Sequence, residues 1–241
     1  MSLGLEINEV SHAYGAKRAL EGVSFSVGEA RFCALLGPNG AGKSTLFSLL
    51  CRLIALQSGT IEIAGIDLTE QPRLALASMG IVFQQSTLDL DLTVRQNLKY
   101  FAGLHGLSGK LVTDAINQSL ERLDMAERID EKVRSLNGGH RRRMEIARAI
   151  IHSPKILLLD EPTVGLDAQT RKAITEHVHD LAEQYGITIL WATHLVDEVK
   201  PQDDVVILHR GQVIRQGIAK EISGDSELAT TFAELTSREV A

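Results

Sequence analysis

The segment Gly37-Pro-Asn-Gly-Ala-Gly-Lys-Ser-Thr45 decides the fold class of this 241-residue chain. It follows the nearly continuous apolar run 31–36, which is typical of a strand that is covered on both faces. A helix is expected to begin near Lys43, immediately after the last glycine of the segment. The spacing Gly-x-x-x-x-Gly-Lys-Ser between a strand and a helix predicts a loop that binds the phosphates of a nucleotide.

The residue types in this loop explain why it suits phosphate. Glycines let the backbone wrap tightly enough for successive N–H groups to point at phosphate oxygens, and the following helix offers its positive end. Lys43 would add a positive charge at the β and γ phosphates, and Ser44 would ligate Mg²⁺. A glycine-rich turn that binds nothing is the alternative, which the flanking strand and helix disfavour. The predicted nucleotide-binding residues here are Gly37, Asn39, Gly40, Gly42, Lys43, Ser44 and Thr45.

A second apolar strand, expected at 155–159, ends in two adjacent carboxylates, Asp160 and Glu161. Alternate side chains of a strand point in opposite directions, so the two carboxylates are expected to do different jobs. We predict that Asp160 holds the Mg²⁺ shell, through water, and that Glu161 orients or deprotonates the water that attacks the γ-phosphate. In the alternative interpretation, Asp160 caps the next segment and Glu161 is only solvated.

The rest of the chain alternates strand and helix patterns, which favours an α/β fold. Residues 3–10 and 23–27 alternate apolar with polar side chains, as half-buried antiparallel strands do. Residues from about 86 to 152 are mostly helical in pattern, so a helical block is expected to be inserted into the α/β core. Further strands are expected at 60–64, 80–83, 188–191 and 205–208, and helices at 94–103, 111–123 and 168–185.

Composition and charge exclude several classes of protein. The chain is 44% hydrophobic and 23% charged, close to the average of globular proteins, which rules out disordered, collagen-like and coiled-coil chains. Its net charge of -6 offers no general attraction to nucleic acid, and no nucleic-acid partner is expected. No apolar run approaches the roughly 20 residues that span a bilayer, and the start lacks the pattern of a secretory leader. Cys33 and Cys51 are predicted to be buried free thiols.

These motifs, in this order, resemble the nucleotide-binding subunit of ATP-binding-cassette (ABC) proteins over residues 3–220. The resemblance implies a P-loop NTPase (RecA-like) α/β core with an antiparallel β subdomain and an inserted helical subdomain. It places the ABC nucleotide-binding domain at 1–220, the helical subdomain at about 86–152, and a short C-terminal tail at 221–241. The implied activity is ATP hydrolysis that is coupled to transport across a membrane.

The resemblance assigns roles to two residues outside the first two motifs. Tyr14 occupies the family's place for an aromatic ring that stacks on adenine, although simple packing would also explain it. Gln84 occupies the place of the family glutamine, which touches Mg²⁺ or the attacking water and senses the transport partner through the helical subdomain. Gln85 is the neighbouring alternative, because either amide could cap the end of the strand.

The segment Leu136-Asn-Gly-Gly-His140 resembles the family signature Leu-Ser-Gly-Gly-Gln, with two departures. In the family, this start of a helix faces the γ-phosphate of an ATP that is bound on a second subunit, which assigns nucleotide contacts to Asn137, Gly138 and Gly139. Asn137 can replace serine both as a helix cap and as a donor. His140 either lengthens the cationic stretch 141–143 or weakens the role of the usual glutamine. The alternative is a capped helix with a solvated basic face.

Two later positions complete the resemblance. Asp167 lies in the family's aspartate loop, through which two subunits communicate and contact nucleotide, although an N-cap would equally explain it. His194 follows the strand at 188–191, where the family places the histidine that holds the γ-phosphate. Because it lies at the end of a strand next to the other phosphate-directed strand ends, a catalytic role is favoured over a structural one. His177 and His179 are expected on the surface of a helix.

The resemblance also implies how the protein works and with what partners. Family members act as pairs, so we expect a homodimer or a pair with a related subunit, with ATP and Mg²⁺ bound and a separate integral-membrane permease. The location implied is the cytoplasmic face of the inner membrane, through that permease.

The segment 138–149 is most similar to export ATPases of the daunorubicin-resistance type, and more weakly to a bacterial subgroup associated with pyrroloquinoline-quinone-dependent catabolism. Export is therefore favoured over import. Three alternatives remain: a soluble ABC ATPase in repair, translation or cofactor assembly, a nucleotide-binding regulator that does not hydrolyse ATP, and a P-loop kinase or GTPase. The last has no use for the signature or for His194.

Overall fold

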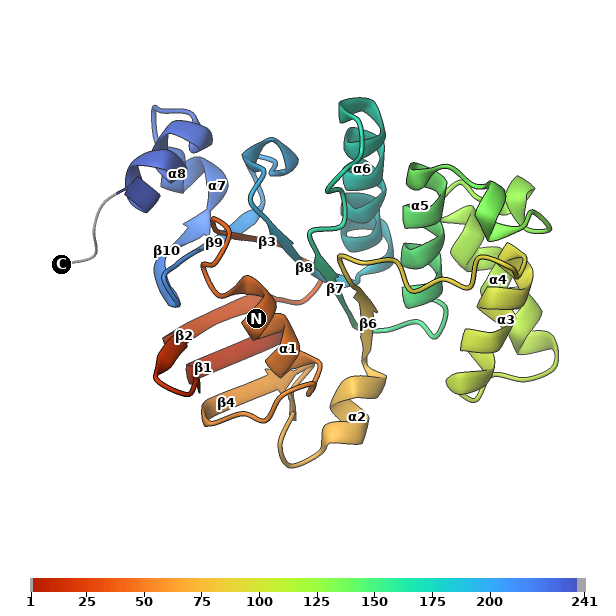
Figure 1. The fold of residues 1–241 in the computed structure, drawn as a ribbon, viewed down its shortest axis with the longest axis horizontal. Helices are drawn as coiled ribbons and strands as arrows, with labels where there is room; N and C mark the ends of the chain where they lie inside the picture. Colours follow the sequence, from red (N-terminus) through yellow and green to blue (C-terminus); the bar gives the residue numbers. More distant parts are fainter. Residues whose placement is uncertain (1, 238–241) are drawn as a thin grey trace.

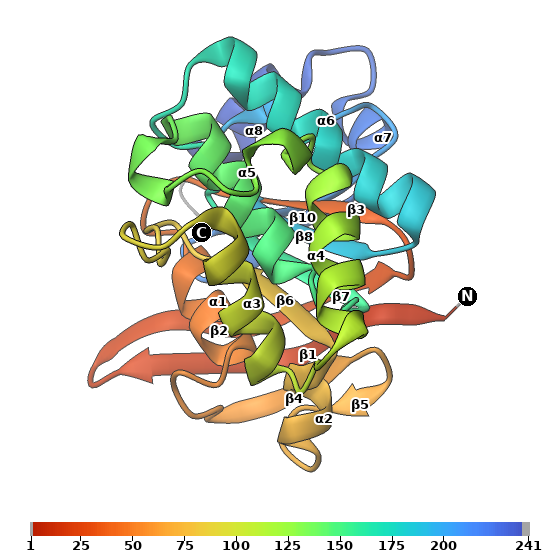
Figure 2. The same cartoon turned by 90° about the vertical axis from the view of Figure 1, so that its right-hand side faces the viewer.

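The computed structural model describes residues 2–237 and contains two β-sheets with helices around them (Figure 1). The smaller sheet, with strands β1, β2, β4 and β5, lies on one side of the molecule, and most helices lie on the other. Figure 2 shows the helices α3, α4 and α5 gathered on one side of the larger sheet. This is the α/β P-loop architecture expected from the sequence.

The larger sheet of the described chain has six strands in the order β10-β9-β3-β8-β7-β6. Neighbours from β9 to β6 run parallel, and β10 is antiparallel to β9. Every residue of β3, β7 and β8 is buried, which explains why these strands are apolar on both faces. The strands are β3 (Phe32–Leu36), β6 (Met79–Val82), β7 (Ile156–Asp160), β8 (Thr188–Thr193), β9 (Asp204–His209) and β10 (Gln212–Ile218).

The smaller sheet is antiparallel, in the order β2-β1-β4-β5. Buried and exposed residues alternate along much of β1 and β2, as the expected half-buried strands require, and both strands extend further than predicted to meet in a hairpin. Its strands are β1 (Leu3–Tyr14), β2 (Lys17–Gly28), β4 (Ser58–Ile63) and β5 (Ile66–Asp67).

The helices follow the expected patterns closely, and α6 has the predicted bounds. They are α1 (Lys43–Leu50), α2 (Pro72–Ala77), α3 (Val94–Leu104), α4 (Lys110–Glu121), α5 (Gly138–Ala149), α6 (Ala168–Tyr185), α7 (Ala219–Ser223) and α8 (Leu228–Ser237). Three short 3₁₀ segments among the described residues are η1 (Ala126–Arg128), η2 (Val133–Ser135) and η3 (Val196–Glu198). No helix within residues 2–237 combines the length and hydropathy that crossing a membrane requires.

Two hydrophobic cores hold these layers together. One joins the smaller sheet to the inner face of the larger sheet and surrounds Leu46 and Phe47 of α1. The other covers the opposite face of the larger sheet and includes buried side chains of α3, α4, α5 and α6. Because α1 lies inside the first core, the phosphate loop that precedes it is anchored between the two sheets.

One surface prediction is wrong. His179 is only 1% exposed, because it lies on the inner face of α6 and its ring stacks on Phe32 at 3.9 Å. Its Nε2 atom is 2.8 Å from an oxygen of the buried Asp203. His177 is partly exposed. Of the two cysteines, both free, Cys33 is buried as predicted, and Cys51 is only partly buried.

Candidate active site

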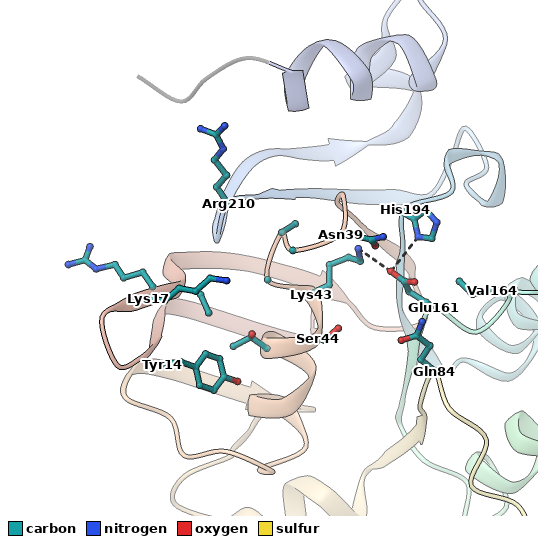
Figure 3. A pocket seen from close by; sticks show the side chains of 16 residues that line it. Tyr14, Lys17, Asn39, Lys43, Ser44, Gln84, Glu161, Val164, His194 and Arg210 are labelled. Atoms are coloured by element: carbon teal, nitrogen blue, oxygen red, sulfur yellow. Dashed lines mark ion pairs between the residues drawn. The ribbon is translucent and has the colours of Figure 1, made fainter.

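A cleft of about 880 Å³ opens where the phosphate loop faces the ends of β7 and β8 (Figure 3). Most of the residues that were predicted to bind or cleave nucleotide line this one cleft. They come from the β1–β2 hairpin, the phosphate loop, the segment after β6, and the ends of β7 and β8. The predicted residues that line it are Tyr14, Asn39, Gly40, Gly42, Lys43, Ser44, Thr45, Gln84, Glu161 and His194.

The phosphate loop runs from the end of β3 to the start of α1 and is pressed against its neighbours. Gly42 caps α1 with φ near +113°, and no side chain caps the helix at this end. A Cβ atom on Gly42 would lie 2.8 Å from the carbonyl oxygen of Ala19, and one on Gly37 would lie 2.5 Å from that of Leu208. Only glycine fits at both positions, and the first N–H groups of α1 stay available to an anion.

Lys43 is buried, and its ammonium group is held at the mouth of the loop. Its Nζ atom donates to the carbonyl oxygens of Gly37 at 2.6 Å and Pro38 at 3.3 Å. The same atom is 3.2 Å from Oε1 of Glu161, as Figure 3 shows. The positive charge is therefore fixed where loop and strand β7 meet, beside the carboxylate that was predicted to act on the attacking water.

Glu161 stands between Lys43 and His194, so the three side chains converge on one point (Figure 3). The distance from its Oε1 atom to Nδ1 of His194 is 3.4 Å. Its side chain is 11% exposed, which argues against a merely solvated carboxylate. Its backbone has φ near +45°, an unusual conformation for a residue with a side chain, and its N–H donates to the carbonyl oxygen of Ala192 at 2.9 Å.

Asp160 is buried at the end of β7, and its Oδ1 atom has no hydrogen-bond partner among the described residues. Burial raises the pKa of Asp160, the charge of Glu161 raises it further, and Lys43 opposes both effects. An unpartnered buried carboxylate oxygen suits a hydrated cation, because Mg²⁺ in nucleotide sites takes one or two protein oxygens, water and substrate phosphates. The residues present therefore fit the predicted Mg²⁺ position, with Ser44 and Gln84 as the other side chains assigned to it.

Tyr14 and Gln84 form opposite ends of the cleft (Figure 3). Tyr14 is 51% exposed and meets His12 edge to face, with ring centroids 4.8 Å apart, so much of its ring is accessible to a base. The side chain of Gln84 is exposed, while its backbone carbonyl accepts from Arg142 at 2.8 Å. Lys17, Arg18 and Arg210 also line the cleft, and the sequence analysis did not select them.

The signature residues do not line the cleft of their own chain. Asn137 is exposed and caps α5, since its Oδ1 atom accepts the N–H of His140 at 2.8 Å. Gly138 is exposed in the first turn. Gly139 is buried against α6, where a Cβ atom would lie 2.4 Å from the methyl carbon of Thr170. The start of α5 therefore presents an uncovered helix N-terminus on the surface.

The surroundings of His140 and Asp167 bear on the alternatives that the sequence left open for them. Burial lowers the pKa of His140, and Arg128 and Arg143 lower it further, which disfavours a positive charge on His140 beside the cationic stretch. Asp167 caps α6: its carboxylate accepts from the N–H of Thr170 at 2.9 Å and the hydroxyl of Thr170 at 2.6 Å. These hydrogen bonds lower the pKa of Asp167. Asp167 also lies outside the cleft of its own chain.

Arg142, in the cationic stretch 141–143, is a functional candidate that no motif singled out, and its burial excludes for this residue the alternative of a solvated basic face. Its side chain is 10% exposed, and its guanidinium donates to the carbonyl oxygens of Phe83 and Gln84, both at 2.8 Å. It also pairs with Glu145 at 2.7 Å. Glu145 in turn accepts the N–H of Thr87 at 3.0 Å.

Arg148 completes this cluster. It donates to the carbonyl oxygen of Thr87 at 3.0 Å and to the Thr87 hydroxyl at 2.5 Å, and it lies over the ring of Phe101. The three charged residues are spaced three apart along α5, which is the signal in the sequence that places them on one helix face. They attach the segment 83–87, which carries Gln84, directly to the helix that begins at the signature.

Comparison with known proteins shows the family of the chain. The profile of the family described as "ABC transporter" matches residues 20–164. The chain is 34% identical over 95% of its length to the linearmycin resistance ATP-binding protein LnrL of Bacillus subtilis, and covers 75% of that protein. It is 37% identical over 92% of its length to the Nod factor export ATP-binding protein I of Paraburkholderia xenovorans, and covers 74% of it.

Other relatives are longer. The chain is 34% identical over 92% of its length to the probable multidrug ABC transporter ATP-binding protein YbhF of Escherichia coli, but spans only 38% of that protein. Among solved structures, cbiO1 from Clostridium perfringens, part of the ABC transporter complex cbiONQ, matches with a TM-score of 0.86 and 30% identity. That match covers 93% of this chain and 92% of cbiO1.

A dimeric post-hydrolysis structure of the ATP-binding cassette MJ0796, bound to ADP and Pi, matches with a TM-score of 0.76 and 26% identity, over 89% of this chain and 98% of that one. The chain therefore belongs to the ABC transporter family.

Proposed function

We propose that this chain binds and hydrolyses ATP as one of a pair of cassettes that drives a separate membrane permease, with export as the direction of transport. The observation that carries the proposal is the convergence of Lys43, Glu161 and His194 on the phosphate loop within one cleft. Residues 1–220 would form the nucleotide-binding domain, and the helical part at about 86–152 would reach the permease. Residues 221–241 would be an additional tail.

The residues have distinct roles in the proposed reaction. Backbone N–H groups of the loop and Lys43 bind the β and γ phosphates, while Tyr14 stacks on adenine. Glu161 orients the attacking water and accepts its proton, and His194 holds the γ-phosphate beside it. Ser44, Gln84 and, through water, Asp160 would hold Mg²⁺, whose charge would offset that of the phosphate oxygens.

The exposed start of α5 supports the pairing. Asn137, Gly138 and Gly139 stand apart from the cleft of their own chain, so they would contact the γ-phosphate of an ATP that is bound on the second copy. Asp167, on the surface beside them, would contact the partner across the same interface. An ATP held between two chains closes the pair, and its cleavage removes the contact that favours the closed state.

Export and a membrane location are supported by the relatives. LnrL is described as a resistance protein and the Paraburkholderia protein as an export protein. In this proposal the chain is bound at the cytoplasmic face of the membrane through its permease.

The variant Glu161→Gln tests the proposal in one experiment. The tagged variant is purified from native membranes with ATP and Mg²⁺ and compared with the unaltered chain. Loss of the general base should reduce phosphate release by at least ~100-fold, while ATP stays bound in a stable pair of cassettes. Light scattering, a phosphate assay and mass spectrometry of co-purified proteins supply the measurements.

Each measurement can contradict a different part of the proposal. Unchanged turnover would show that Glu161 is not the general base. A variant that binds ATP but stays a single molecule would contradict pairing. A purely cytosolic complex without an integral-membrane protein would favour the soluble ABC ATPase instead.

A further inference from the structure

A buried carboxylate outside the cleft, that of Glu198, is not used by the mechanism above. Glu198 ends η3, five residues after the end of β8, and is 2% exposed. Its Oε2 atom accepts from the indole N–H of Trp191 at 2.9 Å and from the hydroxyl of Thr193 at 2.5 Å. Its Oε1 atom accepts from the hydroxyl of Thr163. Three donors, two from strand β8 and one from the loop after β7, therefore meet on one side chain.

The donors flank the two residues that were assigned to the chemistry. Thr163 is two residues after Glu161, and Thr193 immediately precedes His194. The Thr193 hydroxyl also accepts the N–H of Leu195 at 3.0 Å, so the backbone on the far side of His194 belongs to the same network. Glu198 thus joins the loop after β7 to the end of β8 and to the residues that follow it.

Burying the Glu198 carboxylate costs free energy. A buried carboxylate loses its hydration, and only well-placed donors offset that loss. Arg171 pairs with the exposed Asp197, the residue before Glu198, at 3.1 Å, and not with Glu198 itself. Apolar side chains in place of the three donors and the acceptor could fill the same space without that cost. The polar network fixes the relative positions of the groups that it joins, because hydrogen bonds set distances and angles that apolar packing leaves free.

We propose that Glu198 is a positioning residue, which holds the loops of Glu161 and His194 at a fixed spacing through Thr163 and Thr193. The spacing concerned includes the 3.4 Å separation of the Glu161 Oε1 and His194 Nδ1 atoms. The inference rests on the catalytic roles proposed above for those two residues. A small misplacement of a catalytic group lowers the rate of reaction more than it weakens substrate binding. We therefore expect changes at Glu198 to lower kcat and to leave ATP binding almost unchanged.

The variants Glu198→Gln and Glu198→Leu give a graded test. Gln keeps the length of the side chain and can accept two of the three hydrogen bonds, whereas Leu removes all of them. We expect kcat to fall by about tenfold in Glu198→Gln and by about a hundredfold in Glu198→Leu, while KM for ATP changes by less than about threefold. The single tryptophan of the chain is Trp191, so its fluorescence emission should shift in both variants and reports directly on the network.

A second variant keeps the test decisive where Glu198→Leu does not fold. Thr163→Val removes one donor with little change in volume and should lower kcat in the same direction. If both changes act through one network, the loss in the double variant Thr163→Val with Glu198→Gln is smaller than the product of the separate losses. Independent, multiplying losses would contradict a shared network.

Asp203→Asn is the matched control. Asp203 is a buried carboxylate of similar depth, 4% exposed, and it accepts from the N–H of Lys200 and contacts His179, away from both catalytic loops. It should lower thermal stability and leave kcat within about twofold. If Glu198→Gln behaves like this control, with stability reduced and kcat unchanged, the positioning role is refuted.

The same measurements separate this inference from the proposed function. If Glu161→Gln keeps the turnover of the unaltered chain, the proposed assignment of the catalytic base has failed. If Glu161→Gln loses turnover while the Glu198 and Thr163 variants retain it, only the inference has failed.

Discussion

At the scale of single residues, the histidines of this chain show how surroundings decide the charge of one side chain. His152 lies against His105, with parallel rings 3.7 Å apart, and its Nε2 atom is 3.0 Å from the carbonyl oxygen of Met79. Burial and the neighbouring His105 lower the pKa of His152 to about 4, against a smaller opposing effect of the Met79 hydrogen bond. His152 is therefore neutral in the folded protein down to acidic pH.

This shift predicts a loss of stability in acid. The ordinary pKa of histidine is about 6.5. Between pH 6.5 and 4, His152 is therefore protonated in the unfolded chain and neutral in the folded chain. The free energy of unfolding should therefore fall as pH drops through this range, by up to about 1 kcal/mol per pH unit from this residue. Urea unfolding at a series of pH values should show a shallower fall in His152→Gln. Parallel curves for the two proteins would contradict the assignment.

At the scale of elements, helix α5 joins two parts of the site that lie far apart in the sequence. Its first turn carries the signature glycines, and its buried face holds the segment 83–87 through Arg142, Glu145 and Arg148. The signature faces a partner's nucleotide in the proposed pair, and Gln84 faces the nucleotide of its own chain. A movement of α5 would therefore displace both the signature and the segment that carries Gln84.

Arg142→Met tests how strongly this helix and the Gln84 segment are joined. The change leaves the Glu145 carboxylate buried without its cation, and leaves the carbonyl oxygens of Phe83 and Gln84 without their donor. We expect a loss of about 3 kcal/mol in the free energy of unfolding, measured by urea titration. The control Arg143→Met removes the next arginine, whose partner Asp124 is exposed, and should cost about 1 kcal/mol or less. Equal losses would contradict the special position of Arg142.

At the scale of the whole molecule, the cleft and the exposed signature belong to different surfaces. The cleft is lined by the β1–β2 hairpin, the phosphate loop and the residues that follow β6, β7 and β8. The signature begins α5, which packs on the face of the larger sheet opposite the smaller sheet (Figures 1 and 2). A complete site in the proposed pair therefore needs the cleft of one chain and the α5 start of another.

Mixing two inactive variants tests this division. Lys43→Ala damages the cleft and spares the signature, and Gly138→Asp places a negative charge at the signature and spares the cleft. In a mixed pair, one of the two shared sites has neither change, so ATP hydrolysis should rise on mixing to about a quarter of the unaltered rate. A phosphate assay on each variant alone and on the mixture makes the measurement. Activity no higher than the sum of the separate variants would contradict shared sites.

Much of this architecture could be predicted from the sequence alone. The phosphate loop, the strand that ends at Asp160, the bounds of α6 and the helical character of α3 to α5 are local features, since their apolar spacing and glycine positions lie within a few neighbouring residues. The same holds for the cleft residues at the ends of strands, because parallel strands bring their ends to one edge of the sheet. The chemical roles of these residues and the domain limits remain predictions.

Only the tertiary structure decided which polar side chains are buried and which distant groups they contact. His179 was predicted to lie on the surface, but it packs on Phe32, more than a hundred residues away. Nothing in the local sequence indicated that Arg142 binds the carbonyl oxygens of Phe83 and Gln84, more than fifty residues away. Glu198 likewise joins Thr163 and Thr193 only because β7 and β8 are neighbours in the sheet. The burial of a side chain and its hydrogen-bond partners depend on which distant segments come into contact, and the local spacing of residues does not determine those contacts.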